Sequence, residues 1–137
     1  MLANSAKASW AWSRPLIGDG GGYWSFIHVA DAAEATVSAI DRGVPGNIYN
    51  IVDDEPAQVK DWLPTFAAML SARPPMHLPA WLGRLLAGEH MVAMMTEVRG
   101  ASNEKAKREL GWRPGHPSWR EGFAEVLRRQ SAQRSAA

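Results

Sequence analysis

The sequence contains no cysteine, and its four histidines are His28, His77, His90 and His116. The absence of cysteine excludes disulfide bonds and thiolate metal sites, and we expect a cytoplasmic protein. The histidines form no His-Glu-x-x-His motif and no pair spaced four residues apart. On these spacings we expect no metal site.

Long apolar runs are also missing. The N-terminal MLANSAKASWAWSRP has one lysine and no apolar core segment, so it is not expected to be a secretory signal. The most apolar later stretch, Leu78 to Ala87, contains Arg84 and is too short to cross a bilayer. We therefore expect no membrane partner.

Charge of one sign is not in excess. Fifteen Lys and Arg against 14 Asp and Glu give a formal net charge of +1, which disfavours nucleic acid as a partner.

With 137 residues and 46% hydrophobic residues, the chain suits one folded domain. We predict a loose lead-in over 1–14, an α/β domain over 15–128 and a disordered tail over 129–137.

Nucleotide-binding motifs are incomplete. No Gly-Lys-Ser/Thr of a phosphate-binding loop exists, and Tyr23 stands where the last glycine of a dinucleotide fingerprint belongs. The run Gly18 to Gly22 is followed by a predicted strand, not by the helix that the fingerprint requires. We predict a glycine hairpin turn between strands 15–17 and 23–29.

A small β-α-β unit is predicted next. Asp31, with Glu34 three residues on, is typical of a helix N-cap and capping box. Ala33, Val37 and Ile40 then form a stripe at helical spacing. Residues 47–52 resemble a short buried strand, so strand, helix and strand predict a parallel, right-handed unit.

Several helices are predicted after that unit. Asp53, Asp54 and Glu55 before Pro56 are typical of a helix start, which explains them better than paired acid/base carboxylates do. An apolar face at helical spacing follows Pro56 and predicts a helix there. A further helix is predicted over 79–86, whereas 90–98 is ambiguous between helix and loop. Helix EKAKREL is capped at 102 or 103 and ends at Gly111, and Ser118 starts the last helix. The apolar face after Pro56 contains Val59, Trp62, Leu63, Phe66, Met69 and Leu70.

Seven tryptophans stand at irregular intervals, which indicates core anchors and not a repeat.

Three segments of the sequence resemble those of a known family: GDGGGYWSFIHVADAAEA, GNIYNIVDDEP and SNEKAKRELGWRP. In this order and spacing, from about Arg14 to Leu127, they resemble the C-terminal part of extended short-chain dehydrogenase/reductases of the NAD-dependent epimerase/dehydratase family. Bacterial nucleoside-diphosphate-sugar epimerase-like members are the most similar.

The resemblance implies an α/β substrate-binding portion without the Rossmann half, which carries the NAD loop and a Tyr-x-x-x-Lys pair. No such pair is present here, because Ile27 stands four residues after Tyr23 and Asp53 four after Tyr49. The isolated chain is thus expected to be inactive and to bind neither NAD nor NADP, although full-length relatives use one of them. The alternatives are a non-catalytic binding or interaction module and a folding remnant without a role.

The resemblance also suggests a substrate pocket. Trp24 occupies the position, four before His28, where sugar-nucleotide epimerases of the family commonly have a phosphate-binding Arg. A less charged small molecule is therefore an alternative to a sugar-like substrate. We expect a homodimer, because the predicted unit leaves apolar surface and a strand edge uncovered. The predicted pocket residues are Trp24, His28, Asn50, Met95 and Arg99.

Overall fold

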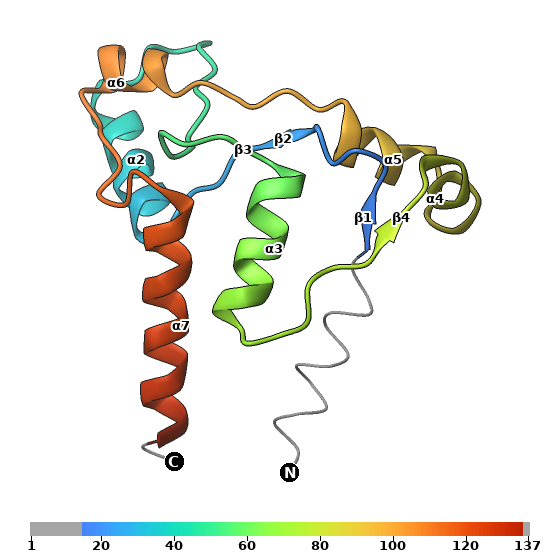
Figure 1. The fold of residues 1–137 in the computed structure, drawn as a ribbon. Coiled ribbons are helices and arrows are strands. Elements are labelled where there is room, and N and C mark those ends of the chain that lie inside the picture. The colour runs from blue at the N-terminus through green and yellow to red at the C-terminus, as the bar shows by residue number, and fades with distance from the viewer. Residues whose placement is uncertain (1–14, 136–137) are drawn as a thin grey trace. The chain divides into compact units, whose positions relative to one another are not determined.

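A computed structural model describes residues 15–135 of the chain, and the predicted lead-in over 1–14 lies outside them. The described part is mixed α/β and rich in helix (Figure 1). The strands are short, and the helices provide most of the regular structure. In chain order the elements are β1 (Leu16–Ile17), β2 (Tyr23–Trp24), α2 (Val29–Arg42), β3 (Ala57–Gln58), α3 (Val59–Met69), β4 (His77–Leu78), α4 (Ala80–Ala87), α5 (Glu89–Thr96), α6 (Glu104–Leu110) and α7 (Trp119–Ser135).

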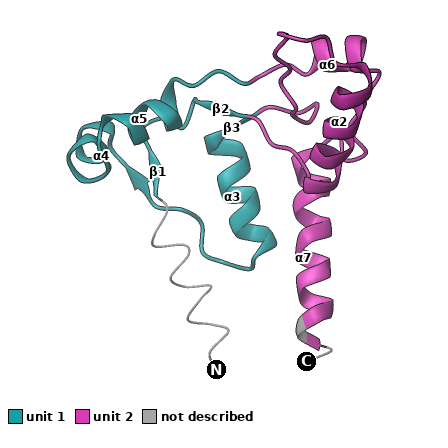
Figure 2. Cartoon of the chain, turned by 180° about the vertical axis from the view of Figure 1, so that it is seen from behind, with its two compact units in different colours: residues 1–24, 57–100 teal, residues 25–56, 101–137 magenta. Residues whose placement is uncertain are grey.

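The chain divides into two compact units (Figure 2). Of the described residues, unit 1 comprises 15–24 and 57–100, and unit 2 comprises 25–56 and 101–135. Each unit is therefore built from two segments that are distant in sequence.

Unit 1 contains both two-stranded sheets. β1 pairs in parallel with β4, and β2 pairs antiparallel with β3. The strands on either side of the glycine run thus pair with later strands and not with each other, which differs from the predicted hairpin. Gly18 and Gly20 adopt positive φ values of 65° and 62°, and this redirects the chain between the two sheets.

The core of unit 1 confirms the predicted apolar face of α3. Val59, Trp62 and Leu63 are buried on that helix. Gly83 of α4 leaves no room for a side chain, because an added Cβ would lie 2.4 Å from a methyl group of Ile17. The other buried apolar residues of this core are Leu16, Ile17, Ala57, Ala67, Val92 and Met95.

Unit 2 has two apolar clusters. Ala35 of α2 packs with Ala106, Leu110 and Trp112, at the end of α6 that Gly111 closes in the predicted left-handed conformation. Around α7, Trp119 is buried, and its ring lies 6.2 Å from that of Phe26 and 5.7 Å from that of Phe123. Phe123 also meets Phe26 edge-on at 5.3 Å.

The strands predicted in unit 2 are not formed. Residues 25–28 and 47–52 lie outside regular structure, although Asp53 N–H donates to Phe26 O at 2.7 Å. A strand needs a continuous ladder with a neighbour. Within 15–135, no strand pairs with either segment. Tyr49 and Ile51 instead pack against the cluster between α2 and α6.

α2 also differs from the prediction. It begins at Val29, and its N-cap is His28, whose Nδ1 accepts the Ala30 N–H at 3.3 Å. Asp31 is therefore inside the helix. The predicted stripe faces away from the core, since Val37 is 59% and Ile40 80% exposed, whereas Ala35 on the opposite side is buried. Periodicity identified the helix but assigned the wrong face.

The C-terminal region differs from the predicted tail over 129–137, because α7 continues through Ser135. Residues 136–137 lie outside the described part. Among the described helices, none has the length and apolar character needed to cross a membrane.

Candidate functional site

The five predicted pocket residues lie in both units. Trp24, Met95 and Arg99 belong to unit 1, and His28 and Asn50 belong to unit 2. Met95 is buried, whereas Arg99 and Asn50 are exposed. That all five border one pocket stays a prediction.

Trp24 is held by two contacts within unit 1. Its indole N–H donates to Met94 O at 2.8 Å, and its ring lies 5.0 Å from the ring of Trp62, which α3 buries. Gly22 permits this approach, because a Cβ there would be 2.8 Å from Met94 O. The ring of Trp24 remains half-buried. Unit 1 thus presents one aromatic ring whose position is fixed by two contacts.

His28 belongs to a second arrangement, the His116 cluster, which we define as His28, Asp31, His116 and Glu125. The rings of His28 and His116 stack with centroids 3.9 Å apart. Asp31 Oδ2 accepts the backbone N–H of His116 at 2.9 Å and lies 3.2 Å from its Nδ1. Nε2 of the same ring is 2.5 Å from Glu125 Oε2. One imidazole is therefore held between two carboxylates.

The carboxylates of this cluster raise the pKa of His116. The hydrogen bond to Glu125 is the main cause, and the bond to Asp31 adds to it, whereas burial acts in the opposite direction. The pKa of Glu125 is lowered, chiefly by the same hydrogen bond. Sequence spacing does not reveal this cluster, because its members come from α2 and its N-cap, from α7 and from the loop between α6 and α7. The spacing of Asp31 and Glu34 also predicts a cap and not a contact with His116.

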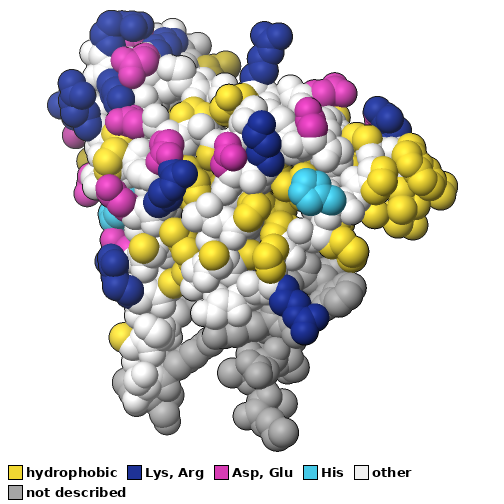
Figure 3. Space-filling model, in the orientation of Figure 1, with side chains coloured by type: hydrophobic (Ala, Val, Ile, Leu, Met, Phe, Trp, Pro, Cys, Tyr) yellow, Lys and Arg dark blue, Asp and Glu magenta, His cyan; other side chains and the backbone are white. Residues whose placement is uncertain are grey.

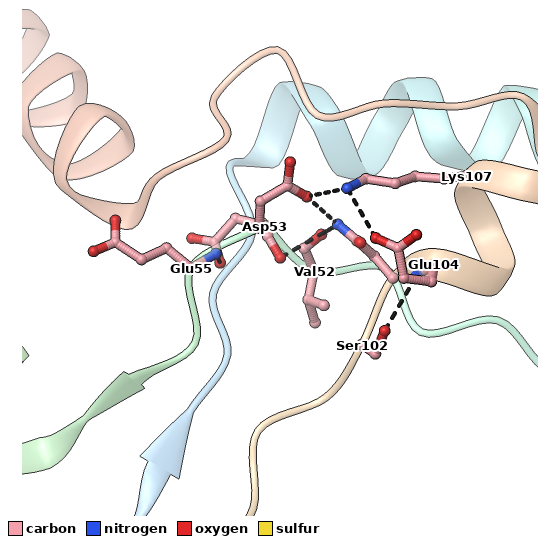
Figure 4. A network of polar contacts seen from close by, with 8 residues as sticks. Val52, Asp53, Glu55, Ser102, Glu104 and Lys107 are labelled. Atoms are coloured by element: carbon pink, nitrogen blue, oxygen red, sulfur yellow. Dashed lines mark hydrogen bonds and ion pairs between the residues drawn. The ribbon is translucent and has the colours of Figure 1, made fainter.

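The acidic run forms a third arrangement (Figure 4). Asp54 Oδ1 accepts from Asn103 Nδ2 at 2.6 Å and pairs with Lys107 Nζ at 2.8 Å. Asn103 Nδ2 also lies 2.8 Å from Val52 O. Glu55 accepts from Ser118 Oγ at 2.5 Å and pairs with Arg120. The run therefore fastens α6 and α7 and does not start a helix as predicted, since α3 begins only at Val59.

Asp53 is the most perturbed acid of this arrangement. It is buried, and Oδ1 accepts the N–H of Glu55 at 3.2 Å. Burial, followed by the charge of Asp54, raises the pKa of Asp53 to about 7, although the backbone N–H of Trp119 opposes the shift. An acid that titrates near neutrality is a candidate proton carrier. Its contacts here, however, are those of a structural linker between Phe26, Glu55 and Trp119.

Asp53→Asn is expected to stabilise the protein at high pH. The folded protein holds a proton on Asp53 up to about pH 7, whereas the unfolded chain loses it near pH 4. Stability from this residue is therefore lost as the pH rises from about 4 to 7. At pH 8 the variant should gain up to about 4 kcal/mol in unfolding free energy, and the gain should shrink toward pH 4. Urea unfolding at several pH values measures this, with the exposed Asp41→Asn as control. A pH-independent difference would contradict the pKa of about 7.

Comparison with known proteins gives the fold its context. No protein-family model matches the chain. A 3-diazoavenalumate denitrifying reductase from a Streptomyces species is 46% identical over 109 residues, which are 80% of this chain and 36% of the reductase. A solved Silicibacter pomeroyi protein of unknown function matches with a TM-score of 0.68 and 27% identity, over 82% of this chain and 40% of its own.

The human epimerase family protein SDR39U1, solved with NADPH, also matches with a TM-score of 0.68, at 21% identity over 82% of this chain and 38% of its own. This chain has the fold of the C-terminal part of an extended short-chain dehydrogenase/reductase. It spans between a third and two fifths of the length of these relatives. The short-chain dehydrogenase/reductase resemblance seen in the sequence is thereby confirmed.

Proposed function

We propose that this chain forms the substrate-side part of an NAD(P)-dependent reductase. The observation that carries the proposal is the 46% identity to the Streptomyces reductase over 109 residues. That identity covers four fifths of the chain, whereas the epimerase-type neighbours share its fold at lower identity. A reductase is therefore favoured over an epimerase or dehydratase.

Cofactor binding is proposed to reside outside this chain. A dinucleotide fingerprint places its glycines between a strand and the start of a helix. Here the run Gly18 to Gly22 joins β1 to β2, so this run lacks the context of that fingerprint. The contribution proposed for this chain is to bind and orient the substrate.

Trp24 is proposed as the main substrate contact. Its ring is held by Met94 O and by Trp62, so stacking on it costs little side-chain entropy. A planar apolar group suits this ring better than a diphosphate, which requires cations. Arg99 is exposed in the same unit and is available for an anionic group of the substrate. The substrate class proposed is a small aromatic or conjugated acid, which is compatible with the name of the Streptomyces relative.

A chimera tests the proposal. Residues 15–127 of this chain replace the matching part of the Streptomyces reductase, and reduction of 3-diazoavenalumate is measured with NADH and with NADPH. We expect kcat/KM within about tenfold of the parent, corresponding to about 1.4 kcal/mol. Trp24→Ala in the chimera should raise KM about tenfold, and the exposed Trp81→Ala should leave KM unchanged. A folded chimera that binds NADH or NADPH without reducing the substrate would refute the proposal.

A second candidate is a non-catalytic interaction module, and exposed apolar surface favours it. On α2, Val29, Val37 and Ile40 are exposed, and on α4, Trp81 and Leu85 are exposed; Figure 3 shows the hydrophobic side chains gathered over α4. Burying such faces between two copies would stabilise the predicted homodimer. Light scattering tests the dimer, because a mass that stays at 15.0 kDa on concentration excludes it.

A further inference from the structure

The His116 cluster contains a donor set that the proposed reductase function does not use. His28, His116 and Glu125 each offer one ligand atom, and these atoms lie within 4.8 Å of one another. All three belong to unit 2. Two imidazoles and one carboxylate are the donors found in three-ligand zinc sites, which leave a fourth position for water. His28 is buried, whereas the side chains of His116 and Glu125 are about one fifth exposed, so solvent reaches one side of the set.

Asp31 supplies the outer contact that such sites require. A metal-bound histidine almost always donates its other ring N–H to a carboxylate or carbonyl, which fixes its tautomer and orientation. Asp31 is 2% exposed and lies 3.2 Å from His116 Nδ1, and it also holds the backbone N–H of His116. Nε2 is thereby directed at Glu125 Oε2. The second oxygen of Glu125 pairs with Arg129, so Oε2 is the ligand atom.

We infer that His28, His116 and Glu125 bind one divalent transition-metal ion, with Zn²⁺ the best match, and that Asp31 orients His116 for it. The ion would replace the direct contact between His116 Nε2 and Glu125 Oε2, which is now 2.5 Å and must lengthen for both atoms to ligate it. The site fastens the loop between α6 and α7 to the start of α2 and to α7 itself. This inference is independent of the proposed reductase function.

Two contacts limit the affinity. The stacked rings of His28 and His116, 3.9 Å apart, must spread for both nitrogens to reach one ion at the usual distance of about 2.0–2.1 Å. His28 keeps its contact with the Ala30 N–H only when Nε2 is the ligand atom, because its Nδ1 accepts that N–H at the start of α2. We therefore expect micromolar affinity, well below that of a preformed four-ligand structural site.

Isothermal titration of the metal-free chain with Zn²⁺ tests the inference, together with Co²⁺ absorption in the visible range. We expect one ion per chain, a Co²⁺ spectrum of low coordination number, and a rise in melting temperature that a chelator reverses. His28→Asn retains an N-cap acceptor, and Glu125→Gln retains side-chain size. Each should weaken Zn²⁺ binding at least about tenfold.

His77→Gln and His90→Gln are the matched controls, because both residues are exposed in unit 1. They should leave the affinity unchanged. Circular dichroism establishes that each variant is folded. Absence of saturable binding, binding that persists in both cluster variants, or binding that is lost in either control would overturn the inference.

Discussion

Asn103→Asp is expected to destabilise the protein at pH 8 by about 3–4 kcal/mol. Asn103 is buried, and its amide donates to Asp54 Oδ1 at 2.6 Å and to Val52 O at 2.8 Å. The substitution replaces this donor by a carboxylate that faces both acceptors. Urea unfolding followed by circular dichroism measures the loss of free energy.

The loss should diminish toward pH 4, because protonation of the introduced carboxylate removes the repulsion and restores one donor. Asn50→Asp is the matched control, since Asn50 is exposed and its amide is 3.5 Å from Ser102 O. We expect a change within about 0.5 kcal/mol for this control. Equal effects in the two variants would show that Asn103 is not the donor that joins the acidic run to α6.

Trp119→Ala is expected to cost about 3–5 kcal/mol of unfolding free energy, the usual range for removing a large buried aromatic residue. Trp119 is 2% exposed and packs between Phe26 and Phe123, so the substitution leaves a cavity in the α7 cluster. A loss of this size is a large part of the stability of a typical domain. Thermal and urea unfolding both report it.

Two further variants show whether the loss of stability comes from lost side-chain packing at a buried position. The buried indole N–H of Trp119 has no hydrogen-bond acceptor among the described residues, so Trp119→Phe retains most of the packing and removes an unpaired donor. It should therefore cost much less than Trp119→Ala. Trp81→Ala, at a residue 66% exposed, should change stability by about 0.5 kcal/mol or less. If Trp81→Ala is as damaging as Trp119→Ala, the assignment of the core is wrong.

Local signals in the sequence determined several helices. The apolar face of α3 was predicted from its spacing, and Val59, Trp62 and Leu63 are buried on it. α6 ends at Gly111 in the left-handed conformation, as predicted. Such features depend on residues within one or two turns of each other, so the sequence alone contains the physical cause. The family resemblance, carried by three quoted segments, also followed from the sequence.

Tertiary structure decided which partners these elements meet. Asp31 had the sequence signature of a cap, yet it holds His116, which is 85 residues away. Val37 and Ile40 had the spacing of a core stripe, yet α2 buries its opposite side. Periodicity shows that a helix has an apolar stripe and does not show what covers it.

The two candidate sites also differ in how much of each could be predicted from the sequence. Trp24 was identified from its place in the resembling segment, but the contacts that fix its ring, with Met94 and Trp62, come from α5 and α3. The His116 cluster has no signature in sequence spacing. Its donors come from separate segments that only folding brings within 4.8 Å, because a site made of side chains distant along the chain is encoded in the packing of the elements that carry them.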